Sequence, residues 1–126
     1  MGTEYLIDTN AVIDYLDDKL PDTGNDLIDG ISTHISVITR IELLAWHDAN
    51  ERQTQILQDF VEFSDVFNLQ EDIILKTISL RKSYKTKLPD AIIAATALVN
   101  NLTIITRNTK DFEKIIGLNV LNPYDI

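Results

Sequence analysis

The sequence contains no cysteine, which excludes disulfides, thiol catalysis and zinc sites built from thiolates. It also has no apolar run near the roughly 20 residues that a membrane-spanning helix needs. Its first ten residues, MGTEYLIDTN, lack the basic and apolar regions of a signal peptide. We therefore expect a cytoplasmic protein without membrane contact. The length of 126 residues predicts a single domain over residues 1–126.

Positive charge is scarce as well: 11 Lys and Arg stand against 20 Asp and Glu, for a net charge of −9. Such a balance normally disfavours a nucleic-acid partner, because phosphates are bound by basic surfaces. Acids that share one pocket would be an exception, since a bound divalent ion reverses the local sign of charge. One basic run remains, with Arg81, Lys82, Lys85 and Lys87. It is equally compatible with a contact to a phosphate backbone and with a solvated helix end.

What the sequence does contain is a regular alternation of short apolar runs and segments with helical spacing. Residues 21–30, rich in Asp, Asn and Gly, are expected to form a loop or a poorly formed short helix. The alternation predicts an α/β fold in which a central, mostly parallel sheet is flanked by helices. The expected strands are 5–7, 34–38, 66–69, 102–106 and 120–121, and the expected helices are 11–16, 39–46, 52–63, 73–84 and 89–98.

Four acidic residues occupy related places in this pattern. Asp8 follows the first expected strand, and Glu42 lies in the first turn of the helix after the second. Asp111 comes just past the strand that ends at Thr106, and Asp90 opens the most apolar helix of the chain. Sites in parallel sheets form at the carboxyl ends of the strands. We therefore expect Asp8, Glu42, Asp90 and Asp111 to converge.

Each acid also has a purely structural interpretation. Asp8 is a preferred residue for capping a helix, and Thr39 with Glu42 matches a capping box. Asp90, one residue after a proline suited to the first helical position, complements the helix dipole, and Asp111 fits a solvated loop. These interpretations do not explain why the acids recur at one edge of one sheet.

Gathering carboxylates has a cost that a metal ion would offset. Two of them about 4 Å apart repel by about 4 kcal/mol at an effective dielectric constant of roughly 20. Mg²⁺ suits such a site, because it takes a few carboxylates and keeps several waters, and Mn²⁺ is an alternative. A metal-bound water can act as a nucleophile on a phosphoryl group. The four acids thus favour a metal-dependent nuclease.

The chain resembles the PIN-domain ribonucleases, and the order and spacing of its motifs are most similar to the VapC toxins of toxin–antitoxin pairs. The resemblance implies an endoribonuclease that acts on RNA, is held inactive by a cognate antitoxin and forms a homodimer. It also implies that Asp8, Glu42, Asp90 and Asp111 are the catalytic and metal-binding quartet, supported by Thr9, Asn10, Thr39 and Asn108. Many relatives carry a further acid where this chain has Asn108, which leaves one or two metal ions open. The motifs that carry the resemblance are residues 6–10 (LIDTN), 39–43 (TRIEL), 88–95 (LPDAIIAA) and 106–112 (TRNTKDF).

Three other functions remain as alternatives. A haloacid-dehalogenase-type phosphatase would need a second Asp two residues after the first, where Asn10 stands. A receiver-type signalling domain would carry an adjacent pair of acids after its first strand, which is absent. A non-catalytic PIN-like module that binds RNA or a partner is disfavoured by the intact acids. His34 and His47 are candidate bases, although core or surface roles suit them better.

Overall fold

The computed structural model describes residues 2–126, in which five short strands form two parallel sheets. β1 (Tyr5–Ile7), β4 (Thr103–Ile105) and β5 (Val120–Leu121) make a three-stranded sheet in the order β1-β4-β5. β2 (His34–Ser36) and β3 (Asp65–Phe67) pair in parallel beside it, with β2 next to β1. Every strand pair is parallel, which confirms the predicted α/β class.

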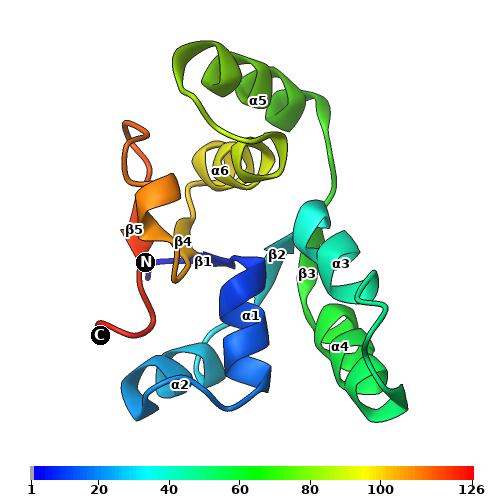
Figure 1. Cartoon of the computed structure of the whole chain (residues 1–126). Coiled ribbons are helices and arrows are strands. Elements are labelled where there is room, and N and C mark those ends of the chain that lie inside the picture. Colours follow the sequence, from blue (N-terminus) through cyan, green and yellow to red (C-terminus); the bar gives the residue numbers. More distant parts are fainter. Residues whose placement is uncertain (1) are drawn as a thin grey trace.

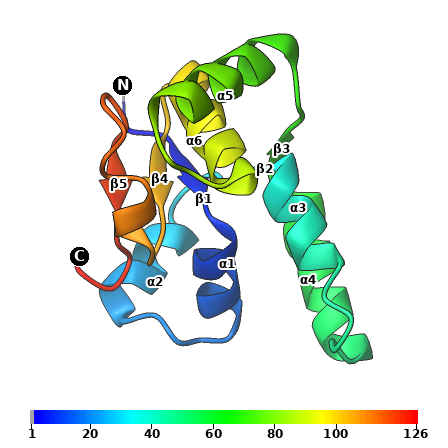
Figure 2. The ribbon, with the colours of Figure 1, turned by 45° about the horizontal axis from the view of Figure 1, so that its top comes forward.

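Helices cover both faces of this strand layer. Figure 1 shows α5 and α6 on one side of the sheet and α1 and α2 on the other. The pair α3 and α4 lies at the β2–β3 side in both views (Figures 1 and 2). No helix within residues 2–126 has the length and apolar character needed to cross a bilayer. The helices are α1 (Thr9–Leu16), α2 (Asp22–Asp29), α3 (Val37–Leu44), α4 (Glu51–Phe63), α5 (Glu71–Ser83), α6 (Leu88–Asn100) and the 3₁₀ helix η1 (Thr109–Asp111).

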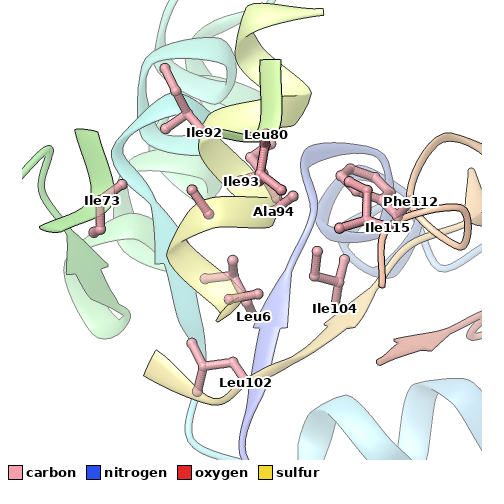
Figure 3. Close-up of a cluster of buried hydrophobic side chains, with 12 residues drawn as sticks. Leu6, Ile73, Leu80, Ile92, Ile93, Ala94, Leu102, Ile104, Phe112 and Ile115 are labelled. Atoms are coloured by element: carbon pink, nitrogen blue, oxygen red, sulfur yellow. The ribbon is translucent and has the colours of Figure 1, made fainter. Parts of the chain in front are cut away.

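Two hydrophobic cores arise because successive side chains of a strand point to opposite faces. Leu6 and Ile104 belong to the core under α5 and α6, which Figure 3 shows together with Phe112. Their neighbours Ile7 and Ile105 belong to the core under α1 to α4. All four strand side chains are at most 1% exposed. The central strands are therefore fixed from both sides, which gives a rigid base to whatever follows their carboxyl ends.

α6 is apolar on nearly every side because it lies between the sheet and α5. Ala94, Ala95 and Ala97 are fully buried, and their small side chains allow close packing. The helix begins at Leu88, so Pro89 is its second residue, whereas the sequence predicts it as the first. The helix is followed by Asn101, which adopts a left-handed conformation (φ 55°) that Asn tolerates well.

Four local expectations from the sequence are corrected by the structure. Residues 22–29 form a regular helix, α2, where a loop or a poorly formed helix is expected. The second strand ends at Ser36 and not at Ile38, because the Ser36 side chain accepts a hydrogen bond from the Ile38 backbone N–H and caps α3 at that point. The capping box expected at Thr39 is therefore wrong. Glu42 lies in the second turn of α3 instead of the first.

Candidate active site

Asp8 directly follows β1 and is buried, with both carboxylate oxygens held by hydrogen bonds. Its Oδ1 accepts from the Thr9 backbone N–H at 2.9 Å, which caps α1. Its Oδ2 accepts from the Thr106 hydroxyl at 2.8 Å and from the Asn10 side-chain amide at 3.1 Å. The capping role expected for Asp8 is confirmed, and the same contacts fix the orientation of its carboxylate.

Thr106 is the residue at this site that the sequence motifs alone do not single out as a site residue. Ile7 pairs with Ile105 in parallel register, so Asp8 and Thr106 leave neighbouring strands side by side. Thr106 is fully buried, and its hydroxyl oxygen also accepts from the Asn108 backbone N–H at 3.0 Å. A usable signal is present in the sequence, because both residues are polar and come directly after a β-branched or apolar strand.

Glu42 reaches the same corner from α3. It is exposed, and its Oε1 accepts a hydrogen bond from the Thr9 hydroxyl at 2.6 Å. The oxygen of that hydroxyl lies 3.0 Å from the hydroxyl oxygen of Thr39, which is fully buried. Thr9 thus links the two acids: its backbone binds Asp8 and its side chain binds Glu42.

Asp90 and Asp111 belong to two further elements, α6 and η1. Asp90 is half-buried in the first turn of α6, and Asp111 is exposed at the end of η1. Burial raises the pKa of Asp90, and the negative charge of Asp111, and to a lesser extent that of Glu42, raises it further. The charges of Lys87 and Lys114 act in the opposite direction on this pKa.

The pKa of Asp8 is raised too, mainly by burial. Its hydrogen bonds from Thr106 and Thr9 oppose this shift, whereas the charges of Asp90 and Glu42 add to it. The negative charge of Glu42 therefore raises the pKa values of both Asp8 and Asp90, and the charge of Asp111 also raises the pKa of Asp90. The four acids form one electrostatically connected set, although within residues 2–126 no three His, Asp or Glu side chains lie close enough together to hold a metal ion in the conformation described.

Asn10 connects this set to the segment that leads from β4 to Asp111. Its side-chain oxygen accepts from the Arg107 backbone N–H at 3.0 Å. The Arg107 guanidinium in turn donates to the buried Asp14 at 2.8 Å, and the same Asp14 oxygen accepts from the Tyr124 hydroxyl at 2.9 Å. Asn10 and Asp14 are four residues apart on one face of α1. The sequence signal that could have indicated the contact is the position of Asp14 within the otherwise apolar segment of residues 11–16.

The remaining polar candidates are placed as follows. Asn108 contributes its backbone N–H to Thr106, and a supporting role for its side chain stays a prediction. His34 begins β2, where its ring lies 3.2 Å from the Tyr5 carbonyl and 3.3 Å from Asp65. This is the amino end of the strand, away from the acids. His47 is exposed beside Asp48, so neither histidine contacts an acid of the set.

The donor set fits a divalent cation by its chemistry. All four side chains offer carboxylate oxygens, which are the ligands that Mg²⁺ and Mn²⁺ prefer. Burial is the main cause of the raised pKa values of Asp8 and Asp90, and repulsion from the neighbouring acids raises both further. A cation would relieve that repulsion, and oxygen ligands without thiolates or imidazoles favour a hard ion.

Comparison with known proteins gives a consistent result. The family model described as "PIN domain" matches residues 5–118. "Ribonuclease VapC1" of Methanocaldococcus jannaschii is 29% identical over 119 residues, which cover 90% of this chain and 82% of that protein. A toxin–antitoxin complex from Klebsiella pneumoniae contains a chain that is 36% identical, with a TM-score of 0.79 and coverage of 98% of this chain and 100% of that one. VapBC-1 from nontypeable Haemophilus influenzae is 27% identical, with a TM-score of 0.79 and coverage of 96% and 98%.

Proposed function

This chain belongs to the PIN domain family, and we propose that it is a metal-dependent endoribonuclease that serves as the toxin of a toxin–antitoxin pair. The observation that carries the proposal lies at the carboxyl end of β1, where the Thr9 backbone N–H donates to Asp8 and the Thr9 hydroxyl donates to Glu42. The negative charges of Glu42 and Asp111, which raise the pKa of Asp90, support the inclusion of the other two acids. The similarity to a protein named as a ribonuclease and to a toxin–antitoxin complex supports it. An RNA substrate would be met in the cytoplasm.

We assign the metal-binding role to Asp8, Glu42, Asp90 and Asp111, with Mg²⁺ or Mn²⁺ as the ion. When bound, such an ion activates water and stabilises negative charge on a phosphoryl oxygen. The chain's own contribution is orientation. Two donors on Oδ2 of Asp8 and one on Oδ1 fix the carboxylate, and they leave about one of its roughly four lone-pair positions, on Oδ1, for a cation.

Thr9 and Thr106 have the same kind of supporting task on the two sides of Asp8. Thr9 donates to Glu42 and therefore holds a flexible, exposed side chain toward the buried acid. Thr106 donates to Asp8 and accepts from the chain that continues to Asp111. Partners of this kind orient metal ligands.

The assignment is tested by cleavage of a labelled RNA with and without Mg²⁺. We expect cleavage by the wild-type chain only when the divalent ion is present. Asp90→Asn should abolish it, because the change removes a charged ligand at almost constant volume. Asp59→Asn is the matched control, since Asp59 is an exposed acid on α4 outside the set. Cleavage that persists in Asp90→Asn, or that proceeds equally well in EDTA, would contradict the proposal.

The proposed partners are an antitoxin protein and a second copy of the chain. The similar Klebsiella pneumoniae chain belongs to a toxin–antitoxin complex, which supports the first. Without metal, the four acids carry uncompensated negative charge. An Arg or Lys side chain of the antitoxin inserted there would gain a charge-assisted hydrogen bond and exclude the cation.

A further inference from the structure

The few basic residues of this acidic chain are concentrated in two short segments. Seven of the 11 lie in residues 81–87 and 107–114, and the first of these segments contains no Asp or Glu. These segments flank Asp90 and include Asp111, two acids of the proposed site. The sequence points to residues 81–87 alone, whereas the second segment is 20 residues further along the chain. The seven are Arg81, Lys82, Lys85, Lys87, Arg107, Lys110 and Lys114.

The structure joins the two segments directly. The Lys114 ammonium donates to the backbone carbonyl of Lys85 at 2.6 Å. Two residues later, the Ile116 backbone N–H donates to the Tyr84 hydroxyl at 3.1 Å. The connection between α5 and α6 therefore lies against the chain that follows η1. Lys87, the N-cap residue of α6, stands three residues before Asp90.

Not all seven basic side chains are available to a ligand. Arg107 is committed to Asp14. Arg81 and Lys82 are exposed, but they lie in the last turn of α5 and are further along the chain from Asp90 than Lys85 and Lys87. The other four are exposed, and none of them makes an ion pair with a carboxylate among residues 2–126. We call these four the basic rim: Lys85, Lys87, Lys110 and Lys114.

We propose that the basic rim binds the phosphate backbone of the RNA substrate beside the scissile phosphate, so that the strand reaches the four acids across the start of α6 and η1. This inference rests on the proposed function. Lysine ammonium groups suit the task, because they act as point charges that bind phosphates without reading the base sequence. In a chain of net charge −9, such a local excess of positive charge also steers the strand to one side of the site.

Among residues 2–126, the α3 side of the site carries fewer basic residues than the rim side. There, α3 and the start of the following loop expose the apolar side chains of Ile41, Leu44 and Trp46. Arg40 is the basic residue of that helix. Leu88 and Ile116 are exposed beside the basic rim as well, so it is the number of basic side chains, and not the apolar surface, that favours approach from the rim side.

The test is equilibrium binding of a fluorescent single-stranded oligoribonucleotide in EDTA, measured at several salt concentrations. The first variant combines Lys85→Gln and Lys87→Gln, whose side chains make no hydrogen bond within residues 2–126. We expect its affinity to fall several-fold, and the slope of log affinity against log salt to decrease in magnitude by about 0.7 for each phosphate that the variant no longer binds. A second variant, Lys110→Gln with Lys114→Gln, tests the other segment in the same way.

The matched control combines Arg52→Gln and Lys76→Gln, which remove the same charge from exposed positions on α4 and α5 outside the rim. It should keep the wild-type salt slope. Equal decreases in affinity in the control and in both rim variants would show that only net charge matters and would overturn the proposal. So would a rim variant that binds as the wild type does.

Binding and cleavage can fail separately, which distinguishes this inference from the proposed function. If wild-type protein binds RNA through the basic rim but never cleaves it, RNA binding by the rim is supported and the proposed nuclease activity is wrong. If the protein cleaves RNA while both rim variants retain the wild-type salt slope, the proposed nuclease activity is supported and the proposed role of the basic rim is wrong.

Discussion

Asp8 shows how a single side chain serves local structure and chemistry together. Its carboxylate caps α1 through the Thr9 N–H, and that contact also fixes the angle at which its second oxygen meets Thr106. The cost of burying the charge appears as a raised pKa. A capping Asn or Ser would stabilise the helix equally well. The choice of a carboxylate at a buried position is therefore better explained by the proposed metal site than by capping.

The first prediction concerns the hydroxyl of Thr106. Thr106→Val keeps the shape of the side chain but removes the donor to Asp8 and the acceptor of the Asn108 N–H. We expect metal affinity or RNA cleavage to fall about 10–100-fold, as is typical when a group that orients a metal ligand is removed.

Thr77→Val is the matched control for this change. Thr77 is also buried and also loses a hydrogen bond, to the Ile73 carbonyl, but it lies on α5 away from the acids. Both variants should lose some stability, and only Thr106→Val should lose activity beyond its folded fraction. Equal activity per folded molecule in the two variants would refute the orienting role.

The second prediction concerns pH and follows from the raised pKa of Asp90. The unfolded chain titrates this group near 3.8, so the folded chain binds its proton more tightly. Stability gained from protonation is complete below the unfolded pKa and is lost as pH rises through the folded one. In EDTA, the free energy of unfolding of the wild type relative to Asp90→Asn should therefore fall as pH is raised from about 4 to about 7.

Urea unfolding of the two proteins at several pH values measures this difference. The comparison cancels most contributions of the other ionisable groups. A difference that stays flat, or that rises with pH, would show that Asp90 is not destabilised by burial and by its acidic neighbours.

At the level of secondary-structure elements, the sequence predicts those whose spacing is regular. β1, β5 and the buried helix α6 are recognisable because apolar runs and Pro89 mark them clearly. The start of α3 cannot be recognised in the same way, because Val37 and Ile38 are β-branched and favour a strand. Only the hydrogen bond to the Ser36 side chain shows that the helix begins at Val37. For α2 the sequence leaves a loop and a poorly formed short helix open, because its Asp, Asn and Gly residues are weak helix formers, whereas the structure shows a regular helix that buries Gly24 and Ile28.

In the candidate site, too, some residues can be predicted from the sequence and others cannot. Asp8, Glu42, Asp90 and Asp111 can be proposed from their places after strands or at a helix start. Thr106 needs the register of β1 against β4, and this register depends on contacts between residues about 100 positions apart. The joining of the two basic segments likewise depends on a contact between Lys114 and Lys85. A polar residue directly after a strand can be recognised in the sequence, but no local pattern shows which of these residues meet in the fold.

The third prediction concerns how α2 holds the C-terminal segment. A Cβ atom at Gly24 would lie 2.1 Å from the Pro123 carbonyl oxygen. Gly24→Ala should therefore push that segment away and disturb Tyr124, whose hydroxyl binds Asp14. We expect a loss of about 1–3 kcal/mol in the free energy of unfolding, despite the higher helix propensity of alanine.

Gly30→Ala provides the comparison, because a Cβ there meets nothing closer than 3.4 Å and the backbone has a negative φ. Its effect should stay within about 1 kcal/mol of zero. Thermal or urea unfolding of both variants decides the matter. If Gly24→Ala proves as stable as Gly30→Ala, the C-terminal segment is not held in the described position.

On the scale of the whole molecule, our proposals place the metal ion, the RNA strand and the antitoxin at the same acids. The fourth prediction is that a basic segment of the cognate antitoxin and the divalent cation compete for the acids around Asp8 and Asp90. Titration of the antitoxin at rising Mg²⁺ and constant ionic strength should show a steadily weaker affinity. An affinity independent of Mg²⁺ would place inhibition elsewhere on the surface.

Four acids from separate elements are proposed to hold one cation site, and Mn²⁺ binding tests this without reference to RNA or to a partner. Calorimetric titration would compare the wild type with Asp8→Asn, Glu42→Gln, Asp90→Asn and Asp111→Asn, and with the control Asp59→Asn. We predict that each of the four changes weakens Mn²⁺ binding by about tenfold or more, whereas the control binds as the wild type does. Binding should also release protons at mildly acidic pH, because the pKa values of Asp8 and Asp90 are raised. Undiminished Mn²⁺ binding in any of the four variants, or no binding by the wild type, would contradict the proposed site.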